Sequence, residues 1–294
     1  MKIKSPLNYT GGKFAIIDEI KNFFPKEINT FYDVFCGGGN VLINVNAKKY
    51  VGIDNNSKLI DLLNFLTTKT KNDINKMITD IVEEYNLTKS WEKGYLYYGV
   101  NSSKGLSLIN SYNFIRLRND YNFSQSIIKL LVLLFYSFNN LFRFNSKGQY
   151  NVPVGKRDYN KNIQKNLYLF IERMYQIKPT FVNLNFINLK QLSIKKMILC
   201  TLPPYLITEA EYNLIWTQEH DNELMKLCNF LNKKNIKFAM SNVIKHHEKT
   251  NIKLMDWVKK NNYNMHIINK NYSNSCYNKK NKNSESIEVL ITNY

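Results

Sequence analysis

The stretch FYDVFCGGGNVLINVNAKKYVGID, residues 31–54, decides the fold. Its first six residues form an apolar run that predicts a buried strand, and the glycines of residues 37–39 predict a tight turn. Residues 41–47 predict the first turns of a helix, and residues 50–54 predict a second strand that ends in Asp54. Together they form a βαβ unit, which is typical of a parallel sheet with covering helices.

The glycine turn has the chemistry of a nucleoside site. Gly37 and Gly39 let the backbone approach a ligand closely, and an acidic residue at the end of the next strand is placed to hold ribose hydroxyls. The third glycine of the dinucleotide fingerprint is absent, because Leu42 occupies that position. The pattern therefore leaves two readings open, a site for an adenosine-type cofactor and a turn with only a structural role.

A second informative stretch, MILCTLPPY, covers residues 197–205. Its apolar run predicts a buried strand, which the two prolines end because neither can donate to a ladder. Ligands bind at the carboxyl ends of strands in open α/β sheets, so residues 202–205 are a candidate site. A strand followed by a stiff turn is the structural alternative.

Further strands and helices alternate along much of the chain. This alternation predicts a mostly parallel sheet with an inserted region between residues 57 and 165. The strand-like runs are residues 181–186, 237–241, 265–268 and 287–292, and the helical patterns are residues 14–23, 59–66, 74–85, 127–138, 164–176, 220–231 and 253–260.

The inserted region contains a basic segment, residues 142–157, that reads as a β-hairpin around residues 145–148. It carries Arg143, Lys147, Lys156 and Arg157 among aromatic residues. Such a hairpin can enter a major groove, where arginine reads guanine bidentately. A solvated basic hairpin without a partner is the alternative.

Composition points to a globular protein with an anionic partner. The 294 residues are 44% hydrophobic and include 41 Lys+Arg against 23 Asp+Glu, a formal net charge of +18. This balance favours nucleic acid, with an anionic membrane surface as the electrostatic competitor.

Other signals for a function class are absent from the sequence. Four scattered cysteines without a CxxC pair and four histidines without an HExxH motif indicate reduced thiols and no metal. The first residues lack the apolar region of a signal peptide, and no run is long enough to span a membrane. We expect a cytoplasmic protein.

Several motifs, in order along nearly the whole chain, resemble the Dam-type DNA adenine methyltransferases, and the likeness to phage-encoded Dam enzymes is especially close. The motifs are PLNYTGGK (6–13), FCGGG (35–39), NLFR (140–143), PVGKR (153–157), LPPY (202–205), LIT (206–208) and SNV (241–243).

The resemblance implies a Rossmann-like S-adenosylmethionine-dependent methyltransferase core, with a mixed, mostly parallel sheet, made of residues 1–56 and 166–294. Residues 57–165 would form a largely helical DNA-recognition domain that carries the hairpin. The implied reaction moves a methyl group to N6 of an adenine flipped out of double-stranded DNA, with GATC as the best site. The product would be S-adenosylhomocysteine, and the enzyme would act as a monomer or weak dimer on DNA. It would work in the cytoplasm, associated with the nucleoid, and this would be the host cell's cytoplasm if the protein is phage-encoded. The resemblance also implies a link to restriction-modification.

The resemblance also assigns roles to individual residues. Tyr205 would stack on the flipped adenine beside Pro203 and Pro204. The cofactor would contact Tyr9, Lys13, Gly37, Gly39 and Asp54, with Asp54 on the ribose and Phe186 near the cofactor adenine. Arg143, Pro153 and Arg157 would read the target sequence, with Lys147 and Lys156 nearby on the basic hairpin.

One position departs from the family pattern. The family motif is Asp-Pro-Pro-Tyr, and Leu202 stands at the Asp position. In the family this carboxylate and the carbonyl of the next residue accept hydrogen bonds from the adenine amino group. Leucine accepts none, and losing a charge-assisted hydrogen bond costs about 1.5–3 kcal/mol, or roughly a tenfold to several-hundredfold loss of rate.

Three readings of the chain therefore remain. The first is a methyltransferase with impaired turnover, and the second is a Dam-like protein that recognises and masks sites without methylating them. Under either of these two interpretations, Leu202 could be a change made to trap a complex or an inactivating change in a decaying gene. A nicotinamide-dependent oxidoreductase is the third, but the missing glycine, the basic hairpin and the double proline disfavour it.

Overall fold

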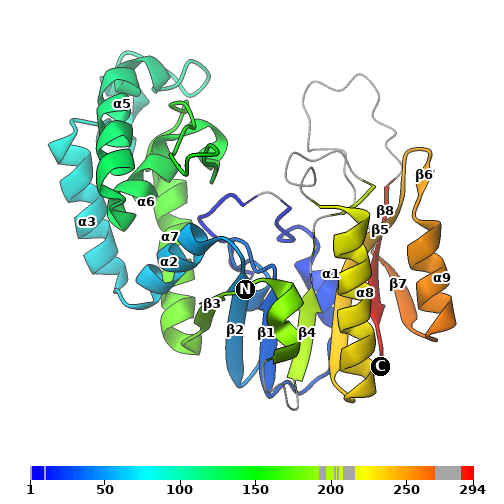
Figure 1. Ribbon diagram of the computed structural model, residues 1–294. Coiled ribbons are helices and arrows are strands. Elements are labelled where there is room, and N and C mark those ends of the chain that lie inside the picture. The colour runs from blue at the N-terminus through cyan, green and yellow to red at the C-terminus, as the bar shows by residue number, and fades with distance from the viewer. Residues whose placement is uncertain are drawn as a thin grey trace. The chain divides into compact units, whose positions relative to one another are not determined.

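The computed structural model describes residues 2–9, 11–191, 197–201, 203, 205–207, 216–268 and 286–294 (Figure 1), with the backbone alone for residues 191 and 197–201. It divides into two compact units. The helical unit is Met1–Gly12 with Lys58–Lys178, and the sheet unit is Lys13–Ser57 with Pro179–Tyr294. The functional domains expected from the sequence, 1–56 with 166–294 and 57–165, stay a prediction.

The sheet unit contains one sheet with the strand order β3-β2-β1-β4-β5-β8-β7, and β6 pairs with β5. The first five strands in this order are mutually parallel, whereas β8 is antiparallel to both β5 and β7. The predicted mixed, mostly parallel sheet is confirmed. The strands are β1 (Thr30–Val34), β2 (Lys49–Asp54), β3 (Thr180–Asn183), β4 (Met197–Thr201), β5 (Lys237–His246), β6 (Lys249–Thr250), β7 (Asn264–Ile268) and β8 (Ser286–Thr292).

Helices cover both faces of this sheet (Figure 1). Successive side chains of a strand point to opposite faces. On β5, Phe238 and Met240 pack in the core cluster shared with α8 (Gln218–Lys233) and α9 (Ile252–Lys260). Ala239, between them, packs in a second cluster with Ile16 and with Ile20 of α1 (Ile17–Asn22). The unit is therefore a three-layer α/β/α structure.

The connection from β1 to β2 corrects one expectation. The helix predicted for residues 41–47 is wrong, because the structure has only a 3-10 helix, η1 (Leu42–Asn44). The Asn44 side chain donates to the backbone oxygen of Asn40 at 2.8 Å, and Val45 is already extended at φ −93° and ψ 152°. Asparagine side chains that bond the local backbone compete with helical hydrogen bonds, and the β-branched neighbours favour extended backbone.

The helical unit packs around α6 (Ile127–Tyr136), in which seven consecutive residues, 130–136, are buried. Asp158, itself fully buried, accepts hydrogen bonds from the Thr88 hydroxyl at 3.0 Å and from the amide and hydroxyl of Ser90. The other helices are α2 (Ser57–Thr67), α3 (Lys71–Glu84), α4 (Ser90–Tyr97), α5 (Ser107–Ser124), η2 (Phe138–Asn140) and α7 (Lys161–Ile177).

The basic hairpin is less regular than the sequence predicts. A turn closes through the hydrogen bond from Gly148 N to Asn145 O at 2.9 Å, and single antiparallel bridges join Phe144 to Tyr150 and residue 137 to residue 154. No β-strand forms between residues 142 and 157, because the second arm of the hairpin makes hydrogen bonds to α5 instead of pairing fully with the first arm. The Asn122 side chain of α5 pairs with both the amide and the carbonyl of Tyr150.

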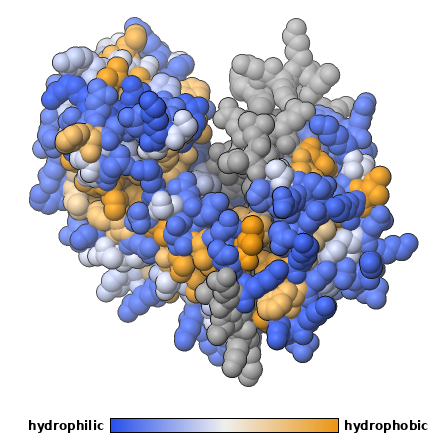
Figure 2. Space-filling model, in the orientation of Figure 1, coloured by the Kyte–Doolittle hydropathy of each residue, from blue (hydrophilic) through white to orange (hydrophobic). Residues whose placement is uncertain are grey.

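The face of the molecule drawn in Figure 2 is mostly hydrophilic. Its hydrophobic residues form small patches. Among the described residues, no helix has the length and apolar character needed to cross a membrane.

Candidate functional site

The site lies where the strand order reverses, between β1 and β4. From β1 the chain continues to β2 on one side and returns to β4 on the other, so the loops after β1 and β4 leave the same edge of the sheet. Crevices at such switch points are where α/β sheets bind ligands. Residues 35–39 and 203–207 are therefore candidates on topology alone.

The loop after β1 has an unusual backbone. Phe35, Gly37 and Gly39 all have positive φ, at 66°, 48° and 76°. Glycine adopts this region freely, but for phenylalanine it is strained. The Phe35 ring packs 5.1 Å from Phe186 and 5.6 Å from Trp216, measured between ring centroids, and these contacts hold the strained residue in place.

Asp54 lies directly beside the glycine turn. Its Oδ2 accepts a hydrogen bond from Gly37 N at 3.1 Å, and its Oδ1 accepts one from Asn56 N at 3.0 Å. The side chain is only 7% exposed, and this burial raises the pKa of its carboxyl group. A carboxylate offers about four acceptor positions, and backbone hydrogen bonds from Gly37, Asn55 and Asn56 leave one for a ligand hydroxyl.

A second acid, Asp33 of β1, was missed in the sequence. It is fully buried, its Oδ2 accepts from Leu42 N at 3.1 Å, and its Oδ1 has no hydrogen-bond partner among the described residues. Burial raises the pKa of Asp33 to about 7, and the negative charge of Asp54 adds to this rise. The sequence did contain a signal for Asp33, because an acid inside an apolar run just before a glycine turn is unusual.

Aromatic rings line the end of β3. Phe186 is 5% exposed and begins the 3-10 helix η3 (Phe186–Gln191), so the strand predicted for residues 181–186 ends earlier, at Asn183. Its ring centroid lies 5.5 Å from that of Trp216, which the sequence analysis did not single out. Trp216 is anchored by its Nε1 donating to Asp221 at 2.5 Å.

Tyr205 belongs to a buried polar cluster. Its hydroxyl donates to Glu288 Oε1 at 2.7 Å and lies 2.5 Å from Ser241 Oγ. Lys13 Nζ is 3.0 Å from the same Glu288 oxygen and 4.2 Å from the centroid of the Tyr205 ring. The structure thus brings together two predicted site residues through Glu288 and Ser241, which were missed as site residues. The signal was one acid inside the apolar run SIEVLIT.

Three predicted residues cannot be added to this cluster. Leu202 and Pro204 lie outside the described residues, and Tyr9 belongs to the helical unit, where its ring centroid is 6.0 Å from that of Phe142. Pro203 is described and buried. Nowhere in the described ranges do three or more metal-ligating side chains gather.

The predicted DNA-contacting residues share one property, exposure to solvent. Arg143 Nε donates to Asn151 at 3.2 Å, and Lys156 Nζ donates to the backbone oxygen of Ser103 at 3.3 Å. All five predicted residues are exposed: Arg143, Lys147, Pro153, Lys156 and Arg157.

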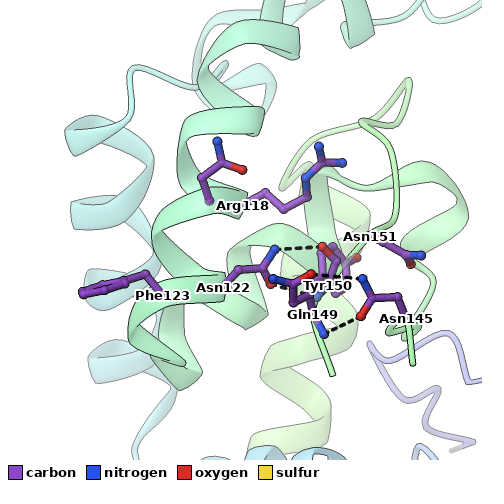
Figure 3. A pocket seen from close by; sticks show the side chains of 8 residues that line it. Arg118, Asn122, Phe123, Asn145, Gln149, Tyr150 and Asn151 are labelled. Atoms are coloured by element: carbon purple, nitrogen blue, oxygen red, sulfur yellow. Dashed lines mark hydrogen bonds between the residues drawn. The ribbon is translucent and has the colours of Figure 1, made fainter. Parts of the chain in front are cut away.

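An open pocket of about 580 Å³ lies between α5 and the hairpin turn (Figure 3). The hairpin contributes Asn145, Gln149, Tyr150 and Asn151 to its lining. Arg118, Asn119, Asn122 and Phe123 come from α5, a helix that the sequence analysis did not predict. Amides and a guanidinium make this lining rich in hydrogen-bond donors and acceptors.

Comparison with known proteins decides the family. The family model described as D12 class N6 adenine-specific DNA methyltransferase matches residues 9–282. The chain belongs to this family. The Dam-type resemblance in the motifs is thereby confirmed at the level of the family.

Curated relatives of this family member match nearly its whole length. The chain is 35% identical over 302 residues to "Modification methylase StsI" of Streptococcus sanguinis and 37% identical over 302 residues to "Type II methyltransferase M.FokI" of Planomicrobium okeanokoites. Each match covers 99% of this chain but only 43% of the relative. The "DNA adenine methylase" of Escherichia coli K12 is 28% identical over 176 residues, which cover 58% of this chain and 55% of the relative.

Proposed function

We propose that this D12 class family member is an S-adenosylmethionine-dependent DNA methyltransferase that acts on N6 of adenine in double-stranded DNA. The observation that carries the proposal is topological: the turn that bonds Gly37 to Asp54 follows β1, and the loop that bears Tyr205 follows the neighbouring strand β4, at one switch point of the sheet. The first suits a nucleoside cofactor and the second carries the remaining Pro-Pro-Tyr of the family motif.

The residues present suit the proposed cofactor. The buried Asp54 carboxylate has a spare acceptor position for a ribose hydroxyl, and the adjacent glycines leave room for close approach. The aromatic group of Phe35, Phe186 and Trp216 offers an apolar wall for an adenine ring. When bound, the cofactor supplies an electrophilic methyl group on a sulfonium. Tyr9, Lys13 and Gly39 remain assigned to cofactor binding by resemblance.

For the target base, we assign stacking to Tyr205 and hydrogen-bond acceptance to the carbonyl of Pro203. An adenine amine cannot be reached inside the base stack, so the target nucleotide must leave the duplex. Tyr205 is 5% exposed. Its ring must therefore gain an open face when the base enters.

Turnover is the weak step, because Leu202 cannot accept a hydrogen bond from the adenine amine. The test measures transfer of tritiated methyl groups to a duplex with one GATC site, by the chain as it is and by Leu202→Asp. We expect Leu202→Asp to transfer at least about tenfold faster. No transfer by either protein would overturn the proposal.

The exposed residues of the hairpin are proposed to bind DNA. Arg143 and Arg157 would read bases, while Lys147 and Lys156 would contact phosphates. Neutralising either lysine should weaken binding to all duplexes and lower the salt slope by about one. Replacing either arginine should instead reduce the preference for GATC. Equal affinity for GATC and scrambled duplexes would exclude GATC as the site.

The second candidate, a protein that masks sites without methylating them, is favoured by Leu202 alone. It predicts specific binding and no transfer by the unchanged chain, with transfer restored in Leu202→Asp. The same paired experiment therefore separates the two candidates.

A further inference from the structure

Strand β8 carries a charged residue that is fully inaccessible to solvent, Glu288. Alternation along the strand puts Glu288 on the same face as Leu290, and Ser241 of β5 on the same face as Ala239. Leu290 and Ala239 pack in the cluster beneath α1. Glu288 and Ser241 therefore lie on the face of the sheet that α1 covers, and Lys13 comes shortly before α1 in the chain.

Burial makes this carboxylate costly unless it is paired. An ion removed from water costs several kcal/mol, and buried ion pairs seldom stabilise a fold more than apolar residues of similar volume would. Glu288 Oε1 lies 3.0 Å from Lys13 Nζ and accepts hydrogen bonds from Tyr205 at 2.7 Å and Ser241 at 3.4 Å. Stability alone is a weak reason for such a group, whereas fixing the positions of its partners is a sufficient one.

The contacts define the position of the Tyr205 ring. Two hydrogen-bond partners, Glu288 and Ser241, hold its hydroxyl, which restricts rotation of the side chain. The Lys13 ammonium lies 4.2 Å from the ring centroid, within the range of a cation–π contact. The Lys13 ammonium therefore occupies one face of the ring.

We propose that Glu288 is a positioning residue, which orients Tyr205 for the target adenine and joins it to Lys13 of the cofactor loop. This inference rests on the proposed function. It assigns Glu288 no contact with substrate, so its effect passes through the Tyr205 hydroxyl and the Lys13 ammonium.

The first experiment needs no ligand. Tyrosine labelled with ¹³C at Cζ gives one NMR signal per residue, and the signal lost in Tyr205→Phe belongs to Tyr205. Glu288→Gln keeps the side-chain shape but removes the charge, so it should move this signal. Asp158→Asn, a buried carboxylate with hydroxyl partners in the helical unit, should leave it in place. A Tyr205 signal that is unmoved in Glu288→Gln overturns the inference.

The second experiment uses turnover in the Leu202→Asp background. Glu288→Gln should lower kcat about tenfold or more. Tyr205→Phe should lose a similar factor, and the double variant should lose little more, because both changes break one unit. Additive losses, or an unchanged kcat in Glu288→Gln, would overturn the inference.

The two experiments fail separately. If Leu202→Asp transfers no methyl groups, the proposed enzyme falls, and the NMR signal alone decides whether Glu288 orients Tyr205. If Leu202→Asp is active and Glu288→Gln matches it in both experiments, only the positioning role falls.

Discussion

Replacing the buried acid of β1, Asp33→Asn, should change how stability depends on pH. The native side chain is fully buried, and one of its oxygens has no hydrogen-bond partner within the described part of the chain. Asparagine keeps an acceptor for Leu42 N and cannot ionise. The substitution therefore removes one buried titration and changes the shape of the side chain little.

The size of the effect follows from the pKa of Asp33, which burial raises from 3.8 to about 7. Below pH 3.8 the Asp33 carboxyl group is protonated in both the folded and the unfolded chain, so its ionisation does not affect stability. Between pH 3.8 and 7 the unfolded chain loses its proton first, so the free energy of unfolding falls as pH rises. Above pH 7 the full cost is present, about 4 kcal/mol at roughly 1.4 kcal/mol per pKa unit.

We therefore expect the free energy of unfolding of Asp33→Asn, relative to that of the parent, to rise by about 4 kcal/mol as the pH increases from 4 to 8. At pH 4 the variant should be less stable by about 1–3 kcal/mol, because its amide adds an unpaired buried donor.

Urea unfolding across this pH range, followed by tryptophan fluorescence, measures the difference. Trp216 and Trp257 lie in the same unit as Asp33, and Trp91 lies in the helical unit. Trp91→Phe in every protein compared removes that contribution, so the remaining signal reports on the sheet unit. The exposed Asp256→Asn is the control and should follow the parent at every pH. If the Asp33→Asn and parent profiles run parallel from pH 4 to pH 8, the buried ionisation is not the cause.

Three further substitutions test packing. Gly52→Ala should destabilise the sheet unit by about 1–3 kcal/mol in urea unfolding, because the added Cβ would lie 2.5 Å from the Phe181 ring. Gly155→Ala should lower the unfolding free energy by at least about as much, measured by thermal unfolding, since its Cβ would clash with the backbone oxygen of Ser137. Asp158→Ala should lower the unfolding free energy of the helical unit by about 2–4 kcal/mol, because it leaves one buried donor on Thr88 and two half-buried donors on Ser90 without their acceptor. Hydrogen exchange of that unit measures the loss.

Strands were more predictable than their connections. Residues 197–201 have the bounds expected from their apolar run, and residues 50–54 fall within β2, because buried parallel strands are continuous apolar runs. The helix expected at residues 41–47 failed because asparagine side chains there bond the local backbone. Helix α5 was missed because its apolar residues lie on all sides, so no 3.6-residue period appears.

The candidate site was partly readable from sequence. Glycines and a strand-end carboxylate have a recognisable spacing, and Gly37 and Asp54 do meet. Glu288 could not be joined to Tyr205 in this way, since 83 residues separate them and only the order of the sheet brings them together. Long-range register of this kind has no local signature in a single sequence.

The position of β8 between β5 and β7 also has a consequence for synthesis. Both neighbours precede it along the chain, so a ribosome releases β5 and β7 before their common partner exists. Until residues 286–292 emerge, β5 and β7 have exposed strand edges, and such edges are open to mispairing. The Lys13–Glu288 ion pair can form only after that strand is in place. A nascent chain thus cannot assemble this cluster before the strand that completes the sheet has been made.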